Sequence, residues 1–187
     1  MAETTLGDVR RRILASLQET ESARPGRRWG RRPIDLVYRD HHVALGVVEM
    51  VEDIARSVGE TKVHVFARAD TPGGTPLVLQ PTNPKAARVE VFVNWLDDVV
   101  HLCPGEHGEI EMWPNRRESA EAFVSYIGRY VDAVISGGFR ETFSGKPEPA
   151  PLATKLEFLV EGRWERRGDL LPPLRRFAWI TRHYEPY

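Results

Sequence analysis

Residues 88–113 read RVEVFVNWLDDVVHLCPGEHGEIEMW, and this stretch decides the fold. Apolar and polar residues alternate along 88–95, along 99–103 and along 109–113. Alternation with a period of two indicates strands that turn one face toward a core. Because only short turns separate these strands, consecutive strands are expected to be antiparallel neighbours. The stretch therefore predicts three strands of an antiparallel meander.

Further strands extend this pattern in both directions along the chain. Upstream, alternation at 62–68 and a short apolar run at 77–79 predict two more strands. Downstream, strands are predicted at 139–143, 154–161 and 176–182. The sequence thus predicts an α+β fold, with an antiparallel meander sheet of about five to seven strands covered on one face by amphipathic helices.

Two amphipathic helices are predicted before the meander. The first spans 5–20, where apolar residues recur at helical spacing and Thr5 can cap the N-terminus. The second is predicted to start after Asp40 as its cap, with an apolar stripe over 44–58. Residues 34–38, just before it, are predicted to form a short strand.

A third helix is predicted over 120–135, where a broad apolar stripe recurs at helical spacing. Asn115 and Glu118 stand at the spacing of a capping box just before it. Gly137 and Gly138 follow the stripe, and glycine commonly ends a helix because it adopts the left-handed conformation freely.

Length, charge and cysteine content limit the class of protein. A chain of 187 residues fits a single α+β domain, with the helix and arginine-rich loop of residues 1–33 at its periphery. The net charge of −1 argues against a general polyanion binder, which needs a basic surplus. Cys103 is the only cysteine, so a reducing, cytoplasmic location is expected. No apolar run approaches the roughly 20 residues of a membrane span, so no membrane partner is expected.

The densest set of ligand-type side chains lies in the last hairpin of the meander, over 101–111. Residues two apart on a strand share a face, as His101 and Cys103 do, and as Glu109 and Glu111 do on the next strand. Thiolate, imidazole and carboxylate groups are zinc ligands, but zinc needs three or four that converge. The alternative is an ordinary hairpin with no metal, and no other cofactor is expected. The candidate zinc ligands are His101, Cys103, His107 and Glu109.

An arginine-rich segment, residues 24–32, is the clearest binding motif. Arginines can neutralise phosphates or carboxylates, and an indole can stack on a base or on a guanidinium group. The alternative is a solvated connector whose arginines pair with acidic helix faces. Exposed aromatic residues near the C-terminus would also mark a partner surface. The candidate partner-binding residues are Arg27, Arg28, Trp29, Arg31, Arg32, Trp179 and Tyr184.

The chain has no phosphate-binding glycine loop, dinucleotide fingerprint, serine nucleophile elbow or His-Glu-x-x-His motif. We therefore expect a non-catalytic protein-binding module of the adaptor, chaperone-like or toxin-immunity type, with another protein as its partner. One alternative is a small metal- or ligand-binding enzyme with its site in hairpin 101–111. Another is a nucleic-acid-binding accessory protein that uses residues 24–32. A homodimer is compatible with each of these functions.

Overall fold

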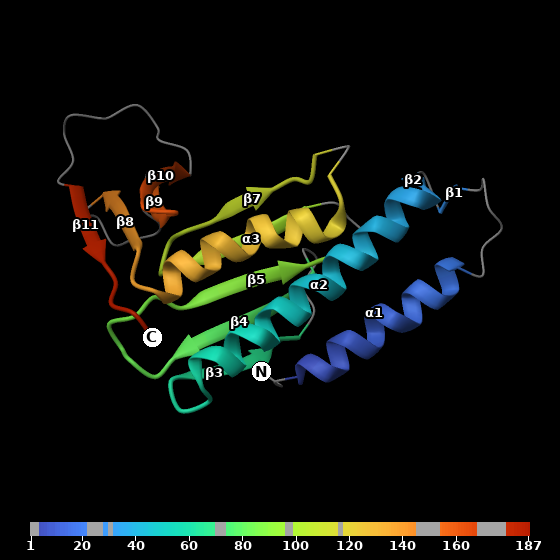
Figure 1. The fold of residues 1–187 in the computed structure, drawn as a ribbon, viewed down its shortest axis with the longest axis horizontal. Helices are drawn as coiled ribbons and strands as arrows, with labels where there is room; N and C mark the ends of the chain where they lie inside the picture. Colours follow the sequence, from blue (N-terminus) through green and yellow to red (C-terminus); the bar gives the residue numbers. More distant parts are fainter. Residues whose placement is uncertain are drawn as a thin grey trace.

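The computed structural model describes residues 4–21, 28–29, 32–69, 74–95, 99–115, 118–144, 154–167 and 179–187. Within them, helices lie on one face of a five-stranded antiparallel sheet, and a four-stranded antiparallel sheet stands at one end of it (Figure 1). This arrangement confirms the predicted α+β class and the meander. The division of the strands between two sheets was not predicted.

The five-stranded sheet follows the order of the chain, as a meander does. Val91 lies opposite Leu77 on one side and Leu102 on the other, and all three side chains are fully buried. Because side chains alternate along a strand, these residues mark the packed face of the sheet. We call the opposite side the far face. The strands are β3 (Val63–Ala67), β4 (Thr75–Pro81), β5 (Val89–Val93), β6 (Val100–Pro104) and β7 (Ile110–Met112).

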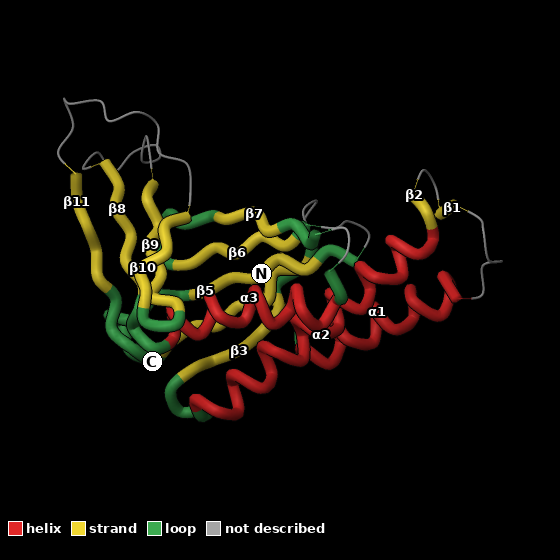
Figure 2. The backbone as a smooth tube through the Cα atoms, turned by 45° about the horizontal axis from the view of Figure 1, so that its top comes forward, coloured by secondary structure: helices red, strands yellow, loops and turns green. Residues whose placement is uncertain are grey.

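Three helices lie over the packed face: α1 (Leu6–Glu21), α2 (Ile34–Val58) and α3 (Ala120–Ile135) (Figures 1 and 2). They bury their apolar stripes against it, and Val47 of α2 and Ile127 of α3 have no exposed surface. Helix α1 packs against α2 and adds fully buried side chains to the same core. No helix in the described part of the chain is long and apolar enough to cross a membrane.

The N-termini of α1 and α3 differ in how well their caps were predicted. Thr5 caps α1: its hydroxyl accepts a hydrogen bond from the Asp8 backbone N–H at 3.1 Å, and the Asp8 carboxylate accepts one from the Thr5 N–H at 3.3 Å. Helix α3 is capped by Ser119, so the prediction of a capping box at Asn115 is wrong. The Glu118 carboxylate does accept a hydrogen bond from the Asn115 N–H, at 3.0 Å, but this pair closes the loop before the helix.

Helix α2 corrects two predictions about its start. It begins at Ile34, so residues 34–38 are helical rather than a strand, and Asp40 lies inside the helix rather than capping it. Contact with α1 explains the extension. His41 has no exposed surface, and its Nε2 lies 2.9 Å from the hydroxyl of Ser16 on α1. Packing of this kind stabilises helical turns that local sequence signals do not specify.

The four-stranded sheet has the order β10-β9-β8-β11. Its inner face carries Phe139 and Phe158, which pair across strands and pack beside Tyr130 of α3. This contact fixes the sheet against the C-terminal end of that helix. The strands are β8 (Phe139–Ser144), β9 (Thr154–Val160), β10 (Arg163–Arg167) and β11 (Trp179–His183). All but β10 were predicted, and residues 176–178 of the predicted last strand lie outside the described residues.

A two-residue ladder precedes α2. In it β1 (Arg28–Trp29) pairs antiparallel with β2 (Arg32–Pro33), within a segment that was predicted to be a loop. The rest of this segment, and the side chains of residues 21–38, lie outside what the structure describes.

Candidate functional site

His101, Cys103, Glu109 and Glu111 of hairpin 101–111 share one side of the sheet, as predicted. Their apolar neighbours on β6 and β7 are buried on the packed face, so the polar side chains project from the far face. His101 lies opposite Glu111, and its Nδ1 is 3.2 Å from the carboxylate of Glu109. Cys103 lies opposite Glu90 of β5. The far face thus carries a line of polar groups across three strands.

His107 does not join this group. Its ring packs edge-on against Phe143 of the other sheet, with ring centroids 5.0 Å apart, and its backbone N–H donates to Glu141. Among the described residues, no three His, Cys, Asp or Glu side chains lie close enough together to hold a metal ion. The zinc hypothesis stays a prediction that the geometry does not support.

The thiol of Cys103 is held in its protonated form. Burial, together with the nearby carboxylates of Glu109 and Glu90, raises its pKa to about 12, while Arg88 opposes this shift. A thiolate, not a thiol, is the nucleophile and the metal ligand. This environment therefore disfavours both a catalytic and a metal-binding role for Cys103.

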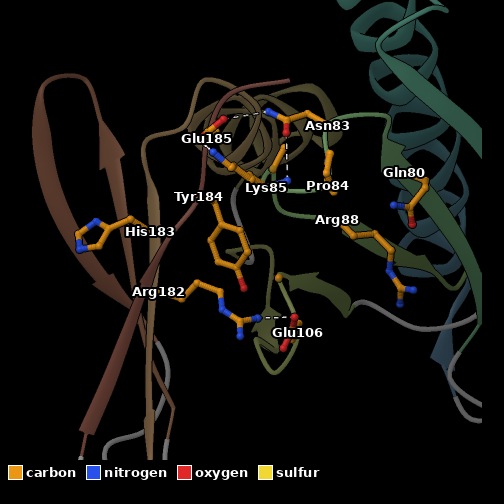
Figure 3. Close-up of a pocket in the computed structure, with 12 residues that line it drawn as sticks. Gln80, Asn83, Pro84, Lys85, Arg88, Glu106, Arg182, His183, Tyr184 and Glu185 are labelled. Atoms are coloured by element: carbon orange, nitrogen blue, oxygen red, sulfur yellow. Dashed lines mark hydrogen bonds and ion pairs between the residues drawn. The ribbon is translucent and has the colours of Figure 1, made fainter.

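An open pocket of about 760 Å³ lies where the far face meets β11 (Figure 3). Its basic side chains are paired: Lys85 lies 3.1 Å from Glu185, and Arg182 forms an ion pair with Glu106. Arg88, at the other wall, pairs with the buried carboxylate Glu90. The pocket therefore presents ion pairs to solvent, which gives it no evident preference for an anionic or a cationic ligand.

Tyr184, a predicted partner-binding residue, faces inward. Its ring stacks on Phe139 with 5.3 Å between centroids, and its hydroxyl donates to Glu141 at 2.9 Å. In Figure 3 its side chain lines the pocket, whereas His183 points to the opposite side of β11. Tyr184 thus has a structural contact on one side and the pocket on the other.

The predicted arginine-rich surface cannot be placed in the same way. Arg27 and Arg31 lie outside the described residues. Arg28, Trp29 and Arg32 belong to the β1–β2 ladder, of which only the backbone is described. A binding role for these residues stays a prediction.

The outer face of the four-stranded sheet is the side opposite Phe139 and Phe158. No described helix packs on it (Figures 1 and 2). Two of its tryptophans are exposed, Trp164 by 45% and Trp179 by 37%, and Leu159, beside Trp164, is exposed by 39%. The strand registers assign to this face Arg140, Thr142, Lys155, Glu157, Leu159, Trp164, Arg166, Trp179, Thr181 and His183.

The outer face is positively charged although the whole chain is not. Among its described residues it carries three Arg or Lys side chains and a single carboxylate, that of Glu157. This carboxylate lies 2.8 Å from Arg140 Nε and 2.7 Å from Lys155 Nζ. The hydrogen bond from Arg140 lowers the pKa of Glu157, so the group stays ionised and shared by two cations. A positive surplus therefore remains on this face.

Trp164 is held in place by the same cluster. The guanidinium carbon of Arg140 lies 4.2 Å from the centre of the Trp164 ring, which is within the range of a cation–π contact. Because Arg140 also binds Glu157, its position is fixed from two sides. The indole is thus presented at the surface in one orientation.

Sequence reasoning missed Trp164 because it missed β10. Gly162 was the signal in the sequence for the turn before β10. Residues 161 and 162 both have positive φ, of 51° and 77°, so β9 and β10 are joined by a tight two-residue turn. Such turns favour glycine, which stands at position 162. The alternation of Trp164 with its charged neighbours then follows from the strand geometry.

No known family model, curated protein or solved structure matches this chain.

Proposed function

We propose that this chain is a protein-binding module and that its contact surface is the outer face of the four-stranded sheet. The observation that carries the proposal is the exposure of Trp164 and Trp179 on a sheet face that no described helix covers. Tryptophan is enriched at the positions that contribute most to protein–protein binding, because its large side chain gains contact area at low entropic cost.

The composition of the face fits a protein partner better than a nucleic acid. One side of the Trp164 ring is occupied by Arg140, which leaves less of it for stacking on a base. Glu157 stands at the centre of the face and would repel phosphates. Single-stranded nucleic acids bind instead to continuous basic grooves with free aromatic rings.

Affinity purification from the source cells tests this proposal, with the double variant W164S/W179S compared with wild type. Trp113 provides a matched control, because it is exposed by 60% but lies beyond β7, away from the outer face. We expect partners to be recovered with wild type and with W113S, and at least about tenfold less with the double variant, since a hot-spot tryptophan contributes more than 1.4 kcal/mol. Equal recovery with all three proteins would contradict the proposal.

A second measurement separates protein from nucleic acid as the partner. Fluorescence anisotropy with labelled single-stranded DNA and RNA should show no salt-sensitive binding to wild-type protein. Salt-sensitive binding that is lost in R166E would instead make the outer face a nucleic-acid surface and would rule out the function proposed here.

A further inference from the structure

The two edges of the four-stranded sheet differ in how they are protected. Four of the five residues of β10 are charged, which is a common means of preventing another chain from pairing with an edge strand. By contrast, β11 begins with Trp179, Ile180 and Thr181, all uncharged and all exposed. Of the two edges, β11 is therefore the one suited to accept an additional strand.

The two sides of β11 present different chemistry. Ile180 lies opposite Phe143 on the inner side, and 45% of its surface is exposed. Thr181 and His183 project on the outer face, where His183 lies opposite Arg140. A strand added beyond β11 would alternate its side chains between these two environments, because successive side chains point to opposite faces. Apolar side chains would then lie beside Ile180, and the others beside the basic outer face.

The charge of the outer face indicates which kind of segment would pair with β11. The positive surplus of the outer face favours acidic side chains on the incoming strand, since complementary charge across an interface favours association. A second copy of this chain fits less well. Antiparallel pairing of two β11 strands would join two outer faces into one surface and place Arg140, Lys155 and Arg166 of both copies on it. Two surfaces of the same charge repel each other, which disfavours this pairing.

We infer that β11 accepts an extended segment of a partner protein as a fifth strand of this sheet, and that this segment alternates acidic residues on the outer face with apolar residues on the inner face. The inference rests on the proposed protein-binding function and adds to it the mode of binding and the chemistry of the partner.

Synthetic peptides test the inference on the full-length chain. The probe is a glutamate–valine alternating peptide of about ten residues, long enough to cover a strand. Its controls are the matching lysine–valine peptide and a glutamate–valine peptide with a central proline, which cannot donate a ladder hydrogen bond. Calorimetry at neutral pH should show binding of the first peptide alone. Hydrogen exchange should show new protection of amides within Trp179–His183.

Paired variants on β11 sharpen the test. Thr181 is exposed on the outer face, so Thr181→Glu and Thr181→Lys remove the same contacts and place opposite charges at one position. We expect the glutamate–valine peptide to bind the first about tenfold more weakly than the second, which corresponds to about 1.4 kcal/mol. Ile180→Ser should weaken binding, whereas Leu14→Ser, at a similarly exposed leucine on α1, should not.

Several outcomes would overturn the inference: absence of peptide binding, equal binding of the lysine or proline peptide, or a dimer in analytical ultracentrifugation that Ile180→Ser abolishes. The peptide comparisons use wild-type protein, so they decide the matter even if a variant does not fold. A native partner that depends on Trp164 and Trp179, together with no peptide protection of β11, would exclude strand addition and leave protein binding in place.

Discussion

The hydroxyl of Tyr184 donates a hydrogen bond of 2.9 Å to Glu141, a carboxylate with no exposed surface. The other oxygen of Glu141 accepts a hydrogen bond of 2.9 Å from the His107 backbone N–H. One buried side chain on β8 therefore binds both the turn that follows β6 and the residue that follows β11. These contacts hold the four-stranded sheet, and with it the outer face and β11, against the five-stranded sheet.

Replacing Tyr184 with Phe should lower the free energy of unfolding by about 1.5–3 kcal/mol, the range for hydrogen bonds to charged groups, because a buried carboxylate loses one of its donors. Urea denaturation of the two proteins measures the difference. Thr181→Val is the control, since its hydrogen bond to Thr142 is exposed and its loss should cost less than about 0.5 kcal/mol. Losses of equal size would show that the hydrogen bond to Glu141 contributes no more to stability than the exposed one of Thr181.

Gly105 lies directly beneath this contact. Its φ is +75°, and a Cβ atom there would lie 2.9 Å from the Tyr184 hydroxyl and 3.1 Å from a Glu141 oxygen. Gly162 has nearly the same φ, +77°, but a Cβ atom there would meet nothing within 4 Å. Both alanine variants should lose about 1 kcal/mol from the left-handed backbone conformation.

Gly105→Ala should lose at least about 1 kcal/mol more than Gly162→Ala, because the added methyl group crowds a packed, buried contact. Urea denaturation of the two variants gives this difference directly. If the two losses agreed within error, the close approach of Gly105 to Tyr184 and Glu141 would be of no energetic consequence.

Stability should fall at alkaline pH because of buried tyrosines. Burial raises the pKa of Tyr130, Tyr184 and Tyr187. An unfolded tyrosine ionises near pH 10, so above about pH 10 the unfolded chain loses protons that the folded chain retains. The stabilisation is therefore fully present below about pH 10 and is lost as pH rises further.

Urea denaturation at a series of alkaline pH values, with tyrosinate absorbance as a second signal, tests this expectation. Tyrosinate from these residues should appear only together with unfolding. Ionisation of all five tyrosines near pH 10 while the protein remains folded would contradict the buried environments described above.

Cys103 should react slowly with iodoacetamide in the folded protein. Its pKa of about 12 leaves very little thiolate at pH 8, whereas an unfolded cysteine ionises near pH 8.5. Mass spectrometry of labelling with and without urea measures the ratio of rates, which we expect to exceed about tenfold. Equal rates would mean that Cys103 is accessible and ionised, and would reopen a chemical role for it.

Periodicity predicted most of the secondary structure, because an amphipathic element carries its own pattern. The meander and the stripe of α3 were predicted on this basis and are confirmed. The start of α2 was not, since it depends on the contact of His41 with α1, which brings together residues 25 positions apart. Local signals contain no information about such a neighbour.

The candidate sites were harder to predict than the fold. The shared face of His101 and Cys103 followed from strand alternation, but His107 joins Glu141 and Phe143 instead, across 34 or more positions of sequence. Which exposed tryptophans share a face depends on β10. The sequence did not predict this strand, because it is short and four of its five residues are charged. Whether side chains from distant strands converge depends on the strand registers and on the order of the strands in the sheet.

The sequence by itself determined the class of fold, the meander and the apolar stripes of the helices, because each follows from the spacing of residues along one element. The tertiary structure alone decided that β8 to β11 form a sheet of their own, that Glu141 and Tyr184 meet inside it, and that Trp164 and Trp179 stand on one basic face that no described helix covers. The physical reason is that strand pairing is non-local: each register is selected by the burial and charge of residues far apart in the chain.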